Sequence, residues 1–329
     1  MYVLAGLTTM VYAYSERDVI DIIHKNLKAE GPITAELLSG GLSGSMLFKV
    51  KTLEQTYVVR FWNMQWAEYF PQDLACQIVA SNSDYGPKLF FTDERSCISV
   101  MEYLKPEVLP ENEKLFKALA DLLKRIHTGP EIPKGFDRSF EFDESIKEVS
   151  ALNLEYINLA LISQVKKDIF DALQHDAHLA PCHGDLHPRN IIFSKGQFFA
   201  VDYTWGGMAD PYWDLAAIAI FNCRTSKEEM LLLKFYLDHE PTSTERAHFS
   251  LAKTTTQIFY GFELLKLAPK HLLNTVTPRA IEKSYMEFAN DSGLNPDNFP
   301  VYGFSLIEEA VSYICSQHYS QDLINLRSN

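Results

Sequence analysis

The first hundred residues begin with one amphipathic segment and continue with runs that favour strands. After Ser15, apolar residues recur at helical spacing as far as Leu27, and Ser15 with Asp18 has the spacing of a capping box. A second helix is predicted over 68–82. Three runs rich in β-branched or aromatic residues predict strands, at 56–62, 88–92 and 97–103. This part of the chain is therefore predicted to be mostly β.

From about Lys105 the hydrophobic pattern takes the period of helices. Glu111–His127 carries leucines on one face, and further helical stretches are predicted near 143–175, 226–239, 244–267, 277–291 and 305–318. Two short strand-like runs, IIF and FFAVDY, interrupt the helices within residues 181–221. The pattern predicts an α+β chain of two lobes: a small β-rich N-terminal lobe over residues 1–103 and a larger helical C-terminal lobe over residues 104–329.

Composition narrows the class of protein. With 47% apolar residues in 329 and only 15 glycines and 15 prolines, the chain is neither disordered nor collagenous. A net charge of −13 disfavours nucleic acid and anionic membranes as partners. The five cysteines form no CxxC pair, which indicates reduced thiols. The uncharged first fourteen residues lack a basic signal region, and we interpret them as an edge strand or an ordered arm. We expect a soluble, cytoplasmic protein.

The sequence CHGDLHPRN at 182–190 carries the candidate chemistry. It places His183, Asp185 and Asn190 at the spacing H-x-D-x-x-x-x-N, and Asp202 ends a strand twelve residues later. Phosphoryl transfer needs one carboxylate to orient and deprotonate the attacking hydroxyl, and an amide and a second carboxylate to hold Mg²⁺. The spacing predicts Asp185 in the first role and Asn190 with Asp202 as the metal ligands.

These residues, followed by GMADPYWDLA at 207–216, resemble the aminoglycoside phosphotransferase and choline kinase superfamily. The run is most similar to bacterial choline kinases and their ethanolamine- and thiamine-kinase relatives. The resemblance covers about residues 37–220 and implies a two-lobed protein-kinase-like fold, with ATP and Mg²⁺ as cofactors. It also implies that Asp214 supports the catalytic loop through backbone N–H groups and that His183 is a buried part of the loop scaffold.

The resemblance assigns a nucleotide-binding set to the N-terminal lobe. Arg60 stands where related kinases carry a phosphate-binding lysine, and an acid on the 68–82 helix should orient it, with Asp73 as the first candidate and Glu68 as the alternative. Glu102 and Leu104 stand at the segment that grips adenine. The backbone of the glycine-rich turn can wrap phosphates, through Gly41, Ser43, Gly44 and Ser45.

The acceptor site is expected in the helical lobe, where aromatic faces and a carboxylate would hold a cation. Tyr260 and Glu263 stand where choline kinases carry tryptophans, and Trp205 and Trp213 are the further candidates. Thr204 replaces the usual glutamate of those enzymes. A small cationic acceptor resembling choline or ethanolamine is therefore predicted.

Two alternatives stay open. Aminoglycosides or other small hydroxylated molecules can be the acceptors of a kinase of this fold, although the ending LINLRSN lacks the acidic character usual in aminoglycoside kinases. A nucleotide-binding pseudokinase that acts as a binding module is the alternative of another class. The presence of Asp185, Asn190 and Asp202 argues against it.

Overall fold

The structure is a computed structural model, and it describes residues 14–38, 45–135, 137–173, 178–276 and 295–327. The chain divides into two compact units, Met1–Val108 with Ile192–Thr204 and Leu109–Ile191 with Trp205–Asn329. The first unit therefore includes a short segment from the second half of the sequence, Ile192–Thr204. The glycine-rich turn, the first thirteen residues and the helix predicted at 277–291 lie outside the described residues.

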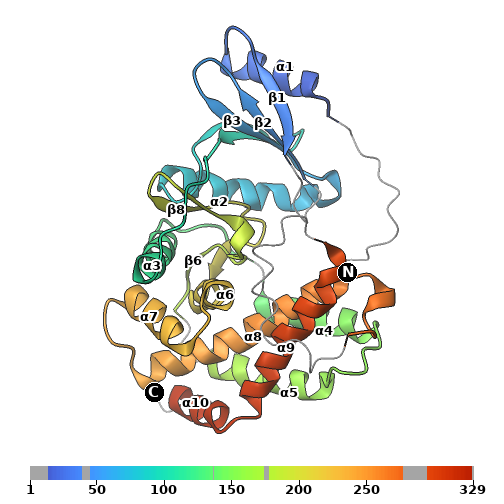
Figure 1. Cartoon of the computed structure of the whole chain (residues 1–329), viewed down its shortest axis with the longest axis vertical. Coiled ribbons are helices and arrows are strands. Elements are labelled where there is room, and N and C mark those ends of the chain that lie inside the picture. Colours follow the sequence, from blue (N-terminus) through green and yellow to red (C-terminus); the bar gives the residue numbers. More distant parts are fainter. Residues whose placement is uncertain (1–13, 39–44, 136, 174–177, 277–294, 328–329) are drawn as a thin grey trace. The chain divides into compact units, whose positions relative to one another are not determined.

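A five-stranded antiparallel sheet forms the first unit, with strand order β1-β2-β3-β5-β4 (Figure 1). Its strands are β1 Thr34–Leu38, β2 Met46–Lys51, β3 Thr56–Phe61, β4 Leu89–Asp93 and β5 Ile98–Glu102. Helix α1, Glu16–Leu27, packs on the sheet, and its capping box between Ser15 and Asp18 is formed as the sequence predicts. Strands predicted from β-branched and aromatic runs are confirmed here.

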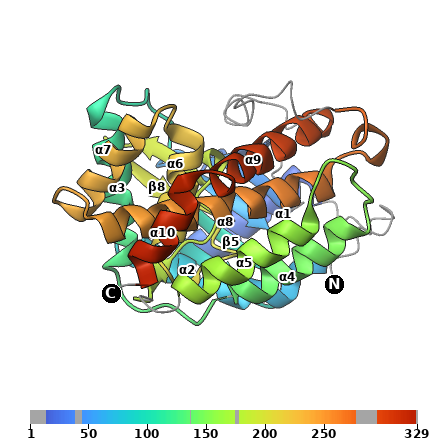
Figure 2. The ribbon, with the colours of Figure 1, turned by 90° about the horizontal axis from the view of Figure 1, so that it is seen from below.

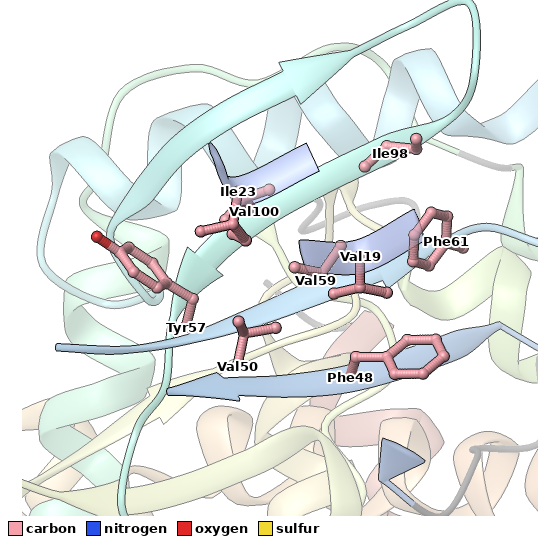
Figure 3. Close-up of a cluster of buried hydrophobic side chains, with 9 residues drawn as sticks. All are labelled: Val19, Ile23, Phe48, Val50, Tyr57, Val59, Phe61, Ile98 and Val100. Atoms are coloured by element: carbon pink, nitrogen blue, oxygen red, sulfur yellow. The ribbon is translucent and has the colours of Figure 1, made fainter. Parts of the chain in front are cut away.

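One buried cluster joins α1 to the sheet of the first unit. Figure 3 shows side chains from the helix and from strands β2, β3 and β5 directed toward one another. Val19, Val50, Val59 and Val100 in this cluster are fully buried. Because alternate residues of a strand face the same side, Val59 points into this core while its neighbour Arg60 points to the other face.

The first unit also contains a helix that follows β3 and a two-stranded hairpin from later in the chain. Helix α2, Phe70–Asn82, follows the 3₁₀ segment η1, Met64–Tyr69, so the helix predicted from residue 68 begins later, with Pro71 in its first turn. The hairpin of β7, Ile191–Ser194, and β8, Gln197–Ala200, belongs largely to this unit. Its Ala200 N–H donates to Tyr85 O at 2.8 Å.

The second unit is built around helix α8, Ser243–Leu267 (Figure 2). Its neighbours are α4, α5, α6, α9 and α10. The remaining elements of the unit are α3 Glu113–His127, α4 Arg138–Ser150, α5 Leu159–Leu173, β6 Ala180–Cys182, β9 Gly207–Ala209, α6 Tyr212–Asn222, α7 Ser226–Leu237, α9 Phe299–Ile314 and α10 Gln317–Arg327. A sheet unit and a mostly helical unit confirm the α+β prediction.

Two helical predictions differ from the structure. The stretch predicted at 143–175 is two helices, α4 and α5, separated by turns after Ser150. Helix α4 begins at Arg138, five residues earlier than expected, because Asp137 caps it there. The stretch predicted at 305–318 spans parts of α9 and α10. Helix α9 already begins at Phe299, where Pro300 suits a first turn. Among the described residues, no helix combines the length and the apolarity needed to cross a membrane.

Candidate active site

Asp185 lies in the loop between β6 and the 3₁₀ turn Pro188–Asn190 of the helical unit. The Tyr260 hydroxyl donates to Asp185 Oδ1 at 3.0 Å, and Asn190 Nδ2 donates to Asp185 Oδ2 at 3.2 Å. The same Nδ2 donates to the backbone oxygen of Asp185 at 2.9 Å. His187 Nε2 lies 3.7 Å from Oδ2. The structure thus holds both carboxylate oxygens of Asp185 in defined directions.

Asn190 meets the chemical requirement for a magnesium ligand. Because its NH₂ group donates to Asp185, its Oδ1 is the atom directed elsewhere, and that oxygen accepts no hydrogen bond from the described residues. An amide oxygen is a hard ligand of the kind that Mg²⁺ binds. Asn190 fits the predicted metal role.

Asp214, on α6, holds the backbone of the loop that carries Asp185. It accepts hydrogen bonds of 2.7 Å from the backbone N–H groups of His183 and Gly184, and His127 Nε2 lies 3.2 Å away. Although complete burial opposes its charge, the hydrogen bond and charge of His127, with the His183 backbone, hold the pKa of Asp214 below its usual value. This geometry supports the structural role that the resemblance implies for Asp214.

His183 is also part of the loop scaffold. Its ring is fully buried, and its Nδ1 lies 3.2 Å from the Asp185 backbone N–H, which donates to it. His127, Cys182 and Asp214 also approach one another within 4.8 Å. Burial raises the pKa of the Cys182 thiol well above its usual value, which disfavours the thiolate that a metal would need. We therefore interpret these three residues as structural support for the loop and not as a metal site.

The second group of candidate residues surrounds Arg60 in the sheet unit. Its Nη2 donates to Asp202 Oδ1 at 2.8 Å, and its Nη1 lies 3.6 Å from Asp73 Oδ2. The guanidinium also lies 4.7 Å from the ring of Trp62. The structure pairs Arg60 with Asp73 and not with Glu68, which is exposed on η1. Arg60 is thereby clamped between two carboxylates.

Asp73 is fully buried, which explains its acid–base behaviour. Burial raises the pKa of Asp73 to about 7, even though the charge of Arg60 acts in the opposite direction. Gln77 Nε2 donates to Asp73 Oδ2 at 2.6 Å. Oδ2 of this carboxyl therefore contacts both Gln77 and Arg60.

Asp202, the predicted metal ligand of this unit, follows β8 with a φ of 66°, in the left-handed region that side chains seldom adopt. Its Oδ1 accepts hydrogen bonds from Arg60 and from the Thr204 hydroxyl, each at 2.8 Å. The side chain is 30% exposed, so a carboxylate oxygen, a ligand suited to Mg²⁺, is accessible to solvent. Asn190 and Asp202 belong to different units.

The remaining nucleotide candidates are placed in part. Glu102 ends β5 and forms an ion pair with Lys195, and its backbone N–H donates to Lys88 O. Leu104 is buried. Of the glycine-rich turn, Ser45 is described and is 4% exposed, whereas Gly41, Ser43 and Gly44 lie outside the described residues.

The side chains predicted to hold an acceptor cation already have protein partners. Glu263 Oε1 lies 2.5 Å from Lys266 Nζ and accepts a hydrogen bond from Ser145. The rings of Trp205 and Trp213 face the guanidinium of Arg138, a residue that sequence reasoning missed. Arg138 stands at the start of a helix outside every motif, so no local signal could have revealed it.

Two units of this kind, one with a clamped arginine and one with an oriented aspartate in an H-x-D loop, define a phosphotransferase of the kinase fold. Residues 34–247, which are 214 of the 329, match the phosphotransferase enzyme family, and the chain belongs to it. The expected superfamily resemblance is confirmed.

Curated relatives match shorter regions. A LicA homolog of Mycoplasma capricolum is 25% identical over 160 residues, which are 48% of this chain and 64% of that protein. LicA of Haemophilus influenzae is 31% identical over 90 residues, 27% of this chain and 26% of that protein. The matched regions thus span less than two thirds of these relatives.

Solved structures share the fold over most of the chain. A choline/ethanolamine kinase family protein from Mesorhizobium loti has a TM-score of 0.68 at 18% identity, covering 94% of this chain and 99% of its own. The choline kinase LicA of Streptococcus pneumoniae has a TM-score of 0.60 at 22% identity, covering 95% and 99%. A ternary complex of streptomycin and ATP with APH(2″)-IIa has a TM-score of 0.57 at 19% identity, covering 77% and 91%.

Proposed function

We propose that this chain is an ATP- and Mg²⁺-dependent kinase that transfers the γ-phosphoryl group to the hydroxyl of a small cationic acceptor resembling choline or ethanolamine. The observation that carries the proposal is the placement of Asp185, whose two carboxylate oxygens are separately fixed by Tyr260 and Asn190. A carboxylate held in this way suits the orientation and deprotonation of an attacking hydroxyl.

Arg60 is the proposed contact for the nucleotide phosphates. Its guanidinium is buried and carries a fixed positive charge, and its contacts with Asp73 and Asp202 hold it in one orientation. Backbone groups near Glu102 and Leu104 are proposed to hold the base, and the 41–45 turn the phosphates. The ATP in the streptomycin complex, a protein of similar fold, supports a nucleotide as the phosphoryl donor.

Asn190 and Asp202 are the residues proposed to hold Mg²⁺, since each offers a hard oxygen. When bound, the ion would neutralise charge on the phosphates during transfer. The chain itself contributes positioning. Asp185 aligns the acceptor hydroxyl and accepts its proton, and Asp214 keeps the loop backbone rigid through the His183 and Gly184 N–H groups.

Two observations support a cationic acceptor: the net negative charge of this chain and its similarity in fold to choline and ethanolamine kinases. The chain carries a net charge of −13, and two proteins of similar fold are a choline/ethanolamine kinase family member and a choline kinase. Tyr260 contacts Asp185 directly, so it lies where an acceptor hydroxyl must bind. Glu263 lies one helical turn further along α8 and is 32% exposed, although it shares its charge with Lys266.

An ADP-release screen tests the function directly. The purified chain is incubated with ATP and Mg²⁺ and with choline, ethanolamine, thiamine, homoserine, methylthioribose or an aminoglycoside in turn. We expect acceptor-dependent ADP release with a hydroxylated amine, and phosphorylated product in the mass spectrum. Turnover with an aminoglycoside alone would favour that alternative. Nucleotide binding without turnover on any acceptor would favour a pseudokinase.

A further inference from the structure

Arg138 is the first residue of α4, and its guanidinium is directed at the catalytic loop of the same unit. Its Nη2 donates to the backbone oxygen of Gly184 at 2.9 Å and lies 3.3 Å from the backbone oxygen of Trp205, to which it also donates. Gly184 immediately precedes Asp185. One cationic side chain therefore joins the loop that carries the candidate base to the segment that follows Asp202.

Three aromatic rings enclose this guanidinium. It lies 5.1 Å from the ring centroid of Trp213, 5.5 Å from that of Trp205 and 6.0 Å from that of Phe259. Such distances are typical of cation–π attraction, which strengthens when water is excluded. The rings thus form a box, and the cation inside it is a residue of the chain itself.

The fit around Gly184 shows how tightly this arrangement is packed. Gly184 has a φ of +80°, and a Cβ there would lie 2.1 Å from Arg138 Nη2 and 2.3 Å from Trp205 O. Its N–H donates to Asp214 at 2.7 Å, while its carbonyl accepts from Arg138. The two backbone polar groups of this residue are therefore held by side chains of opposite charge, Asp214 and Arg138.

Burying a guanidinium carries a cost in free energy. Burial lowers the pKa of Arg138, with Tyr260, Asp214 and Asp185 acting in the opposite direction, and its Nη1 has no hydrogen-bond partner among the described residues. An apolar side chain would fill the aromatic box without that penalty. The cation must therefore contribute something that packing alone does not, and its hydrogen bonds to the loop carbonyls are the contribution that the structure shows.

We propose that Arg138 is a positioning residue for phosphoryl transfer: it fixes the backbone that presents Asp185, and the box of Trp205, Trp213 and Phe259 houses Arg138 and not the ammonium group of an acceptor. This inference rests on the proposed kinase function. It makes Arg138 the counterpart of Asp214, with the cation on the carbonyl side of Gly184 and the anion on the N–H side.

Steady-state kinetics of Arg138→Ala and Arg138→Lys test the role, with the exposed Arg95→Met as the matched control. We expect kcat to fall about 10²-fold in Arg138→Ala, because small displacements of a catalytic group are costly, while KM for ATP and for the acceptor changes less than about threefold. Arg138→Lys keeps the charge but loses the planar fork, so it should recover only part of the rate. A loss confined to the acceptor KM, or an unchanged kcat, would overturn the proposal.

Chemical rescue separates positioning from a general structural defect. Guanidinium chloride at millimolar concentration should restore part of the kcat of Arg138→Ala and none of that of Asp185→Ala. Two results together would contradict the proposal: no rescue of a folded Arg138→Ala variant, and a loss of acceptor affinity in Trp205→Leu as large as that in Arg138→Ala. They would indicate that the aromatic box binds the acceptor.

A readout without turnover keeps this inference separate from the proposed function. Amide hydrogen exchange in a peptide covering 182–190 should be faster in Arg138→Ala than in wild type, while peptides from the sheet unit are unchanged. If the acceptor screen fails but exchange responds, the kinase assignment is wrong and the loop-positioning role stands. Unchanged exchange in Arg138→Ala and Arg138→Lys would refute the role itself.

Discussion

The hydroxyl of Tyr260 donates a hydrogen bond of 3.0 Å to Oδ1 of Asp185, a residue 75 positions earlier in the chain. Burial raises the pKa of Tyr260 well above its usual value, and the nearby charge of Asp185 adds to the effect. The phenol therefore remains a proton donor to the carboxylate throughout the neutral range. A side chain predicted to contact the acceptor is thus hydrogen-bonded to the candidate base.

The first prediction concerns Asp185. Asp185→Asn and Asp185→Ala should lower kcat by about 10²–10⁴-fold, because the positioned base is lost. ATP affinity and the unfolding transition should stay close to wild type, since Asp185 is proposed to act on the acceptor. Single-turnover kinetics with isothermal titration of ATP measures both, and Asp238→Ala, an exposed site, is the control. A parallel loss of ATP affinity would contradict the assigned role.

The second prediction tests the Tyr260 hydroxyl. Tyr260→Phe removes one hydrogen bond to a carboxylate, so kcat should fall roughly 10-fold or more while KM for ATP is unchanged. Tyr313→Phe is the matched control, because it removes a hydroxyl that donates to Asp322 elsewhere in the helical unit. Equal effects of the two substitutions would show that the Tyr260 bond has no special part in the reaction.

The third prediction concerns the metal ligands. Asp202→Ala should abolish the Mg²⁺ dependence of nucleotide affinity, because a hard cation loses a carboxylate oxygen. Asn190→Ala should weaken it less, since a neutral amide oxygen interacts less strongly with the ion. Nucleotide affinity is titrated at increasing Mg²⁺ concentration, with Thr204→Ala as the control for the hydrogen bond to Asp202. An Asp202 variant with wild-type Mg²⁺ dependence would exclude this residue as a ligand.

The fourth prediction is a pH dependence of stability that originates at Asp73. Its pKa is about 7 in the folded chain, against about 3.9 for an unfolded aspartate. Between these values the folded state binds more protons, so the free energy of unfolding should decrease as the pH rises from about 4 to about 7. In Asp73→Asn this decrease should be smaller by roughly 1–3 kcal/mol.

Urea denaturation at pH 5 and pH 8 measures this difference between wild type and Asp73→Asn. Glu68→Gln, which changes an exposed acid on η1, should keep the wild-type dependence. Identical pH profiles for wild type and Asp73→Asn would show that Asp73 is ionised across the whole range.

The fifth prediction concerns acceptor binding. Glu263→Gln should raise the KM for a cationic acceptor with little change in the KM for ATP, because it removes an interaction made equally in the ground and transition states. Glu148→Gln is the matched control, since Glu148 and Glu263 both pair with Lys266. If the two variants behave alike, the effect comes from Lys266, and Glu263 has no contact with the acceptor.

Local sequence determined the secondary structure wherever its causes are local. Ser15 with Asp18 and Thr242 with Glu245 form capping boxes, because the groups that satisfy the helix N-terminus lie three residues away. Runs of β-branched and aromatic residues form β3 and β5, because such side chains pack well on the pleated surface of a sheet. The stretch predicted at 143–175 is divided by turns after Ser150, and Asp137 caps α4 earlier than the hydrophobic period indicates.

The sequence by itself also brought candidate residues of the site together, because H-x-D-x-x-x-x-N places His183, Asp185 and Asn190 in one loop. Only the tertiary structure decided their partners. Arg60 meets Asp202 across 142 positions and Arg138 meets Gly184 across 46, contacts that depend on how distant elements pack. The physical reason is that an aromatic residue or a carboxylate has the same composition whether it faces a ligand or another side chain. In the folded chain the rings of Trp205 and Trp213 contact the guanidinium of Arg138. This contact depends on long-range packing, so no local sequence pattern predicts it.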